Sequence, residues 1–366
     1  MIYSRLPTIS PQQVAAAFDL GGRVLDVQPL GRGLINDTYL VTTDALGCRF
    51  VVLQRINRRA FPQPELIIQN LRLLTRHARA QDKHTLRIPE LFAARNGQDF
   101  VLDDADGFWR AQSYIENTTT LESLRSEREA EATGAALGQF HTLASGIDLQ
   151  RLHATRPHFH QTPFYFTRFT DVAATAENIP ASIDLKWCTD FAEARRKSIS
   201  TLENAKQQGE LILRVIHGDP KLDNFLFDAI DGHVVSLIDL DTVQPGLVHY
   251  DIGDCLRSCA NPAGESPADL DDIRFDLDIC HALLKGYLNE ARNLLTPTDH
   301  AYLYEAIRLI PLELGLRFLT DHLENDTYFK TEWRGQNLHR AMGQFRLTAD
   351  IEKNEQRIKM LIAQAV

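Results

Sequence analysis

The chain has 366 residues, and its 39 Lys and Arg against 49 Asp and Glu give a formal net charge of −10. This length predicts two domains or lobes with separate cores, and 44% hydrophobic with 24% charged residues argues against a disordered protein. The negative charge also argues against nucleic acid or an anionic membrane surface as the main partner.

Residues 1–115 are predicted to form a small lobe of short strands around one long helix. The strands are expected where short β-rich runs are bounded by turns, at 23–30, 38–42, 50–54, 91–94 and 108–112. Pro64 opens the helix, which extends from Glu65 to about Ala80 with apolar residues at helical spacing. Gly31 and Gly33 lie in the first turn, where glycines let backbone amides approach phosphate oxygens.

Residues 116–366 are predicted to form a larger and mostly helical lobe, with the boundary near 113–120. Apolar residues at helical spacing predict long helices around 127–143, 302–323 and 337–363. A small β-rich lobe followed by a large helical lobe predicts an α+β fold.

The five cysteines are few and unpatterned, which is typical of a reducing compartment. The N-terminal residues lack the basic start and apolar core of a signal peptide, and no stretch approaches the roughly 20 apolar residues needed to span a bilayer. We therefore expect a cytoplasmic protein without a membrane partner. No sequence feature marks a dimer interface, so a monomer or a weak homodimer is expected.

The strongest motif is His217-Gly218-Asp219, with Asn224 five residues later and Asp239 at the end of an apolar run. Apolar segments anchor both loops, so the two carboxylates and the carboxamide can converge on one cleft. Oxygen ligands of this kind suit Mg²⁺ together with substrate phosphates. The other carboxylate can then orient or deprotonate a hydroxyl nucleophile, as in kinase-type phosphoryl transfer.

These motifs resemble the catalytic and metal-binding loops of the aminoglycoside phosphotransferase and choline kinase-like family, which has a protein-kinase-like, two-lobed fold. The resemblance implies that Asp219 is the catalytic base, that Asn224 and Asp239 hold Mg²⁺, and that ATP lies between the lobes. By its order in the chain, the segment with Gln112, Ser113 and Ile115 corresponds to the interlobe hinge that binds adenine.

Further segments are similar to the N-acetylhexosamine 1-kinase branch of that family, at 33–39, 53–57, 238–246, 317–321 and 326–330. Enzymes of this branch phosphorylate the anomeric hydroxyl of a free N-acetylated amino sugar, using ATP and Mg²⁺. The resemblance implies that Arg317 and Tyr328 bind the sugar. Trp333 offers a ring face suited to a sugar, and Asp241 is a candidate for a sugar or metal contact or for a structural hydrogen bond.

Two positions depart from the family pattern. Leu34 stands where the branch carries a sugar-contacting His, which leaves the preferred sugar open. On the third strand, Gln54 and Arg55 replace a phosphate-binding Lys. Because successive strand residues point to opposite faces, only one of the two can face the nucleotide. Arg55 is our candidate for this contact. If Gln54 faces the nucleotide instead, a positive charge is missing there, and Arg32 or Arg55 is the candidate to supply it.

Two other functions remain open from the sequence. One keeps the chemistry and changes the acceptor to choline, ethanolamine, homoserine or an aminoglycoside. The other is a nucleotide-binding module without catalysis, which the missing strand Lys favours and the intact catalytic motifs oppose. Finally, His153, His158 and His160 are predicted to lie in a loop held by polar contacts, because no neighbouring ligand spacing supports a metal site.

Overall fold

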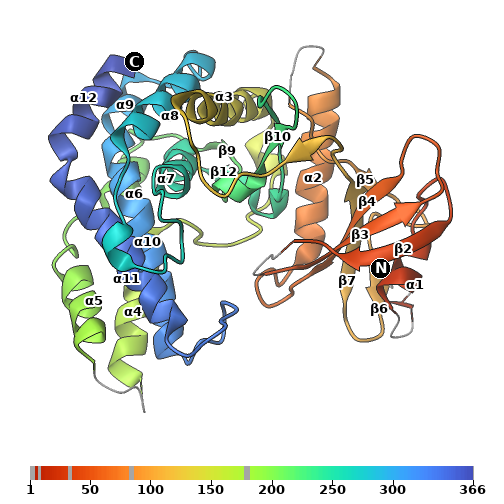
Figure 1. Cartoon of the computed structure of the whole chain (residues 1–366), viewed down its shortest axis with the longest axis horizontal. Coiled ribbons are helices and arrows are strands. Elements are labelled where there is room, and N and C mark those ends of the chain that lie inside the picture. The colour runs from red at the N-terminus through yellow and green to blue at the C-terminus, as the bar shows by residue number, and fades with distance from the viewer. Residues whose placement is uncertain (1–4, 7–9, 32–34, 82–85, 177–181, 366) are drawn as a thin grey trace.

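The computed structural model describes residues 5–6, 10–31, 35–81, 86–176 and 182–365. A β-rich lobe is followed by a larger helical lobe, and α2 (Pro64–Arg79) lies between them (Figure 1). This arrangement is the predicted α+β fold class. Among the residues described, no helix is both long enough and apolar enough to cross a bilayer.

The N-terminal lobe is built on a seven-stranded sheet in the order β1-β6-β7-β4-β3-β2, with β5 beside β7. All neighbours are antiparallel except β1 and β6. One face packs against α1 (Pro11–Ala16) through a core that includes Val51 and Leu53. The strands are β1 (Arg5–Leu6), β2 (Val24–Pro29), β3 (Asp37–Thr43), β4 (Phe50–Ile56), β5 (Leu91–Phe92), β6 (Val101–Asp103) and β7 (Phe108–Ser113).

Helix α2 packs between the two lobes. It begins at Pro64, whose missing N–H costs nothing in the first helical turn. Its apolar face, with Ile67 and Leu71, belongs to the same buried cluster as residues of the C-terminal lobe. In addition, the Asn70 amide donates to the carbonyls of His153 and Val243, at 2.8 Å each. The sheet is thus held against the C-terminal lobe by both apolar and polar contacts.

The C-terminal lobe is a helical assembly with two small sheets. Helix α3 packs against α8, and α10 packs against α4, α7 and α11. The helices are α3 (Glu127–Ala144), α4 (Thr162–Thr175), α5 (Ile183–Glu193), α6 (Thr201–Gln207), α7 (Val248–Cys259), α8 (Leu277–Glu290), α9 (Pro297–Ala301), α10 (Leu303–Leu323), α11 (Gln336–Lys353) and α12 (Glu355–Ala365), with short 3₁₀ turns η1 (Leu149–Arg151), η2 (Leu222–Asn224), η3 (Leu240–Thr242) and η4 (Leu270–Asp272). The sheets pair β8 (Thr118–Thr119), β10 (Phe225–Asp228) and β11 (Val234–Leu237), and β9 (Arg214–Ile216) with β12 (Gln244–Gly246).

The predicted single helix at 337–363 is wrong, because the chain breaks at Asn354 into α11 and α12. The Asn354 side-chain amide donates to the Asp350 carbonyl at 2.9 Å and so caps α11. The Asn354 carbonyl then accepts the first hydrogen bond of α12, from Ile358 N–H at 3.0 Å. Asn is favoured at helix ends because its short amide can replace backbone partners.

Candidate active site

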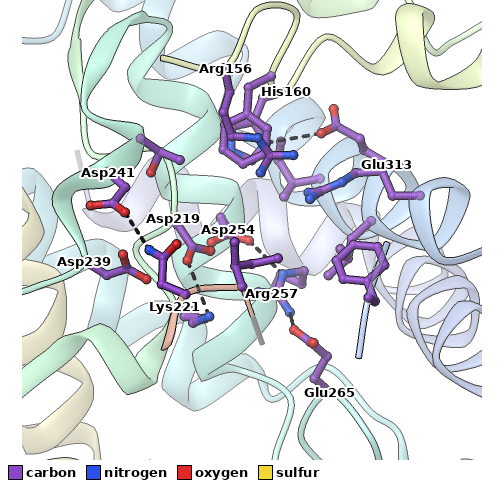
Figure 2. Close-up of a pocket in the computed structure, with 18 of the residues that line it drawn as sticks. Arg156, His160, Asp219, Lys221, Asp239, Asp241, Asp254, Arg257, Glu265 and Glu313 are labelled. Atoms are coloured by element: carbon purple, nitrogen blue, oxygen red, sulfur yellow. Dashed lines mark hydrogen bonds and ion pairs between the residues drawn. The ribbon is translucent and has the colours of Figure 1, made fainter. Parts of the chain in front are cut away.

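A cavity lies where the N-terminal sheet meets the C-terminal lobe (Figure 2). It encloses about 1040 Å³, including its solvent-open part. The N-terminal lobe contributes Asn36, Thr38 and Gln54 to its wall. The C-terminal lobe contributes three carboxylates from the loops after β9 and β11, namely Asp219, Asp239 and Asp241. It also contributes several aromatic and basic side chains. The cavity therefore brings both predicted carboxylate loops together.

The loop of Asp219 is fixed by a buried carboxylate from α7. Asp251 accepts hydrogen bonds from the backbone N–H of His217 at 2.6 Å and of Gly218 at 2.8 Å. The Nε2 atom of His141 lies 2.8 Å from the same carboxylate. Gly218 has φ of +86°, and a Cβ there would lie 2.7 Å from the Thr242 carbonyl oxygen. Only glycine fits this turn without strain, so the loop places Asp219 in one position.

The Asp219 carboxylate faces the cavity beside one cation and one amide. Lys221 Nζ lies 3.4 Å from its Oδ2, and Asn224 Nδ2 lies 3.3 Å from the same oxygen. Burial by itself would raise the pKa of the Asp219 carboxyl. The charge of Lys221, with smaller contributions from His217 and Arg257, outweighs burial and lowers this pKa below its usual value. Asp219 is therefore ionised at neutral pH and can accept a hydrogen bond from a hydroxyl group.

Asp239 supplies a carboxylate that no described side chain neutralises. It ends β11 in the left-handed region, with φ of +63°, and its carboxylate makes no hydrogen bond or ion pair with any residue the structure describes. Burial, followed by the nearby carboxylates of Asp241 and Asp219, raises the pKa of the Asp239 carboxyl from its usual 3.8 to about 7. Asn224 is not in the cavity wall, but its backbone carbonyl accepts from the backbone N–H of Ile238 at 2.9 Å and its Nδ2 donates to the Asp219 carbonyl at 2.7 Å. The Asp239 carboxylate and the Asn224 amide oxygen are donors of the kind that fits Mg²⁺.

Asp241 is already engaged by the N-terminal lobe. It forms a buried ion pair with Arg110 on β7, and the side chains of the two residues are only 2% and 1% exposed. The Asn36 amide donates to Asp241 Oδ2 at 2.8 Å. Although Asp241 lines the cavity, its oxygens serve a contact between the lobes. Of the roles left open for it, this geometry favours the structural one.

The strand β4 turns Gln54, and not Arg55, towards the cavity. Gln54 lines the cavity, and its Oε1 accepts from Arg110 at 2.6 and 3.0 Å. The Arg55 guanidinium lies on the other face of the sheet, 5.7 Å from the Trp109 ring centroid. The structure therefore does not bring Arg55 to the site, because the alternation of β4 points it away. The cation next to Gln54 is Arg110, from the neighbouring strand β7.

The remaining candidates for nucleotide contact do not line the cavity. Gly31 is exposed in a turn with φ of +73°, and Arg32 and Gly33 lie outside the described residues. Gln112, Ser113 and Ile115 lie where the chain passes between the lobes. The Ser113 N–H is already bonded to the Glu90 carbonyl at 2.8 Å, and the Ile115 carbonyl accepts from Thr118 at 2.7 Å. The hinge assignment of Gln112, Ser113 and Ile115 therefore stays a prediction.

At the other end of the cavity, Arg317 on α10 lies among aromatic rings. Its guanidinium carbon is 5.2 Å from the Phe159 ring centroid, 5.5 Å from that of Tyr165 and 5.6 Å from that of Phe329. Tyr328 is not in the cavity wall, but its hydroxyl accepts from the Arg156 guanidinium at 2.9 Å. Arg156 itself lines the cavity. Arg317 therefore lines the cavity, whereas Tyr328 is joined to the cavity wall only by its hydrogen bond with Arg156.

Trp333 lies elsewhere. It is 50% exposed and lines a separate surface depression with His322, Asn325 and Arg334. The structure therefore does not bring Trp333 to the cavity, because the segment after Phe329 leads away from it towards α11. Trp333 was a candidate only because its indole ring suits a sugar, and the type of a side chain does not determine where it points.

The histidine loop is held by polar contacts, as predicted. His160 is buried, with Nε2 2.7 Å from the Gly218 carbonyl oxygen and Nδ1 3.3 Å from a carboxylate oxygen of Glu313. His158 instead stacks on Phe164. Among the described residues, the only metal-like group of His, Cys, Asp and Glu lies on the β10–β11 turn and includes none of these histidines. His160 therefore supports the backbone of the Asp219 loop.

Sequence reasoning missed Arg110, Arg156, Asp251 and Glu313. Asp251 lies in a motif of its own, His249-Tyr250-Asp251, where a charged residue within a buried helix is unusual. That signal could have identified it. Nothing in the local sequence distinguishes Arg110 or Arg156, since both depend on contacts with residues more than 50 positions away.

Comparisons with known proteins agree with this geometry. A family model described as the phosphotransferase enzyme family matches residues 26–287. An aminoglycoside phosphotransferase from Alicyclobacillus acidocaldarius superposes with a TM-score of 0.64 at 16% identity, over 99% of this chain and 98% of that one.

Two further solved structures span nearly the whole chain. A microcompartment-associated aminopropanol kinase superposes with a TM-score of 0.59 at 19% identity, over 95% of this chain and 97% of the other. The GDP complex of an aminoglycoside 2′-phosphotransferase-IIIa gives 0.57 at 13% identity, over 88% and 93%. This chain therefore has the two-lobed, protein-kinase-like fold of these structures.

Proposed function

Because this chain belongs to the phosphotransferase enzyme family, we propose that it transfers the γ-phosphoryl group of ATP to the anomeric hydroxyl of a free sugar. The sugar would be an N-acetylhexosamine or a related one, and the product a sugar 1-phosphate. The observation that carries the proposal is the ionised Asp219, which a loop fixed by Asp251 places in the wall of a cavity that Asp239 and Arg317 also line.

The proposed step takes place at the Asp219 carboxylate. The sugar C1 oxygen forms a bond to the γ-phosphorus, and the bond from that phosphorus to the oxygen of ADP breaks. The hydroxyl proton passes to Asp219, whose oxygens lie within reach of a group in the cavity. Lys221, 3.4 Å from Asp219, lies where its positive charge can meet the phosphoryl oxygens. We assign residues 1–115 to nucleotide binding and 116–366 to catalysis and acceptor binding.

Asn224 and Asp239 would hold Mg²⁺. When bound, the ion would neutralise the negative charge that accumulates on the ATP phosphates. The donor set supports this assignment, because the Asp239 carboxylate lacks a described partner and its pKa is raised to about 7 by burial and by Asp241 and Asp219. Gln54 would face the nucleotide from the N-terminal lobe, where it is oriented by Arg110.

The acceptor end of the cavity supports a polar, non-cationic acceptor. Arg156 and Arg317 both line it, and a cationic amine would be repelled by them. A guanidinium group can donate to two neighbouring sugar oxygens in a fork. Phe159 and Phe329 add apolar faces of the kind that pack on a sugar ring. This is the reason to prefer a sugar to choline, ethanolamine or an aminoglycoside.

The test is ADP release from Mg·ATP with a panel of free sugars, amino alcohols and aminoglycosides. We expect release that depends on a sugar and disappears in Asp219→Asn. Release that depends on an amino alcohol or an aminoglycoside would refute the sugar assignment and keep the phosphotransfer. If ATP binds and no acceptor stimulates release, the chain is a nucleotide-binding module without catalysis.

A further inference from the structure

Two positively charged side chains share one aromatic ring at the acceptor end of the cavity. The guanidinium carbon of Arg156 lies 4.2 Å from the Phe159 ring centroid, and that of Arg317 lies 5.2 Å from the same centroid. Arg156 comes from the loop before α4, and Arg317 comes from α10. A ring face attracts a cation, but it carries no net negative charge. The repulsion between the two guanidinium groups is therefore not compensated by Phe159.

Neither arginine has a carboxylate partner among the residues described. The Arg156 guanidinium donates to the neutral hydroxyl of Tyr328 at 2.9 Å. Arg317 contacts the rings of Phe159, Tyr165 and Phe329. The charges of Glu313 and Asp219 act on it from farther away than an ion pair. In a chain with ten more acidic than basic residues, two cations in a cavity wall that form no ion pair with a described carboxylate are unusual.

The carboxylates in the cavity wall are already occupied by other groups. Glu313 is 3.3 Å from His160 Nδ1 and accepts from Thr162 at 3.1 Å (Figure 2). Asp254 and Glu265 both pair with Arg257, at 2.8 and 3.3 Å. The carboxylates near the phosphoryl end are Asp219, Asp239 and Asp241, described above. Arg156 and Arg317 are thus cations of the cavity wall that no described carboxylate pairs with at ion-pair distance.

We propose that the acceptor is a sugar with an anionic substituent, which binds between Arg156 and Arg317. This inference rests on the proposed function and narrows its substrate class. A carboxylate, as in a hexuronate, and a phosphate, as in a hexose 6-phosphate, both match the planar fork of a guanidinium group. The chemistry of transfer is unchanged, because the C1 oxygen still bonds to the γ-phosphorus, ADP leaves and the proton passes to Asp219.

The experiment compares matched acceptors by kcat/KM, measured as ADP release from Mg·ATP. The pairs are glucose with glucuronate, galactose with galacturonate, and N-acetylglucosamine with its 6-phosphate, while glucosamine supplies a positive charge. We expect at least one anionic sugar to exceed its neutral partner by about 10- to 100-fold, mostly through KM, since that range corresponds to about one hydrogen bond between charged groups. The carboxylate and phosphate arms distinguish the two kinds of anion.

Variants connect the preference to the two arginines. Arg156→Gln and Arg317→Gln should each reduce the anionic-to-neutral ratio of kcat/KM towards one, with a larger effect on KM than on kcat. Calorimetric binding of the preferred anionic sugar gives a second readout if turnover is too slow to measure. Arg23→Gln also removes one positive charge, from an exposed pair with Asp44, and should leave the ratio unchanged.

The outcomes separate this inference from the function on which it rests. If neutral sugars are phosphorylated as well as their anionic partners, or better, the inference is wrong and the sugar kinase assignment stands. If the anionic preference is present but survives both arginine substitutions, the assigned site is wrong. If only amino alcohols or aminoglycosides are phosphorylated, or if no acceptor is, both the inference and the proposed sugar kinase function are refuted.

Discussion

At the scale of single residues, the three cavity carboxylates differ in what surrounds them. Asp219 has Lys221 nearby and a lowered pKa, Asp241 is paired with Arg110, and Asp239 has no described partner and a raised pKa. Asp219 is thus ionised and can accept a hydrogen bond, Asp241 pairs with a cation of the N-terminal lobe, and Asp239 has no described ion-pair partner. The same type of side chain, an aspartate, thus differs in charge state and partners at the three positions because its neighbours differ.

Replacing Asp219 by Asn should lower kcat by about 10²- to 10⁴-fold, the usual range for loss of a general base. The amide keeps the shape of the side chain, so ATP should still bind with an affinity close to that of the wild type. Steady-state turnover and calorimetric titration with ATP measure the two effects separately. Turnover within a few-fold of the wild type would show that Asp219 is not the base.

Asp239→Asn should stabilise the free protein while abolishing turnover. Because the folded-state pKa of this carboxyl is raised to about 7 by burial and neighbouring carboxylates, its ionisation destabilises the fold. Below the unfolded-state pKa the carboxyl costs nothing, and the cost grows as pH rises towards about 7. Thermal unfolding without Mg²⁺ or nucleotide should therefore show a higher midpoint for Asp239→Asn at pH 8, with a much smaller difference at pH 4. An unchanged or lower midpoint at pH 8 would contradict this account.

Spacing along the chain was enough to predict that Asp219 and Asp239 line one cavity, because both loops leave short buried strands. Asn224 is not in the cavity wall, but it lies beside Asp219, as its spacing also predicted. It was not enough for Arg55 and Trp333, whose residue types suit the chemistry but whose side chains point elsewhere. Arg110 was missed because its residue type does not mark it, although its side chain does reach the site. Its contacts with Gln54 and Asp241 depend on the register of β4 and β7, which no local pattern encodes.

At the scale of elements, the turn between β9 and η2 determines where Asp219 lies. The turn depends on Gly218, which combines a positive φ with a close approach to Thr242. Strands β2, β3, β4, β5 and β7 and helices α2, α3 and α10 lie close to the ranges that the apolar patterning predicted, whereas β1 and β6 were not predicted. The break at Asn354 was not, because periodicity continues across it and only the capping hydrogen bonds of Asn354 end α11.

Gly218→Ala and Gly232→Ala form a matched pair that tests this turn. Both glycines have positive φ, at +86° and +75°, but only Gly218 lacks room for a methyl group. Gly232→Ala should cost about 1–2 kcal/mol of stability, the cost of an L residue in the left-handed region, and leave kcat unchanged. Gly218→Ala should cost more and also lower kcat by displacing Asp219. Urea unfolding and turnover measure both, and equal effects of the two changes would show that the turn does not position Asp219.

At the scale of the whole molecule, polar contacts cross between the lobes around the cavity. Asp241 forms an ion pair with Arg110 and accepts a hydrogen bond from Asn36. Lys330, in the segment after α10, lies 3.6 Å from Asp37 on β3. Asn70 adds contacts from α2. The order of a β-rich lobe and a helical lobe was predictable from composition along the chain, whereas these contacts join residues up to about 300 positions apart.

Removing one partner of the buried ion pair between Arg110 and Asp241 should destabilise the protein strongly. Arg110→Met leaves the Asp241 carboxylate buried without its cation, and the expected cost is about 3–5 kcal/mol. Adding Asp241→Asn removes the stranded charge and should recover a large part of this loss. Urea unfolding of both single variants and the double variant gives the coupling energy. If Arg110→Met is as stable as the wild type, the pair does not hold the lobes together.

The central claim is transfer of the γ-phosphoryl group to the C1 hydroxyl of a sugar, and identification of the product tests it most directly. The protein is incubated with Mg·ATP and the sugar that stimulates ADP release most, and phosphorus NMR of the product is recorded with coupling to sugar protons. The account predicts a phosphorus resonance coupled to the anomeric proton, present with the wild type and absent with Asp219→Asn. Coupling to the protons at C6 or at another ring position, or formation of the same product by Asp219→Asn, would contradict it.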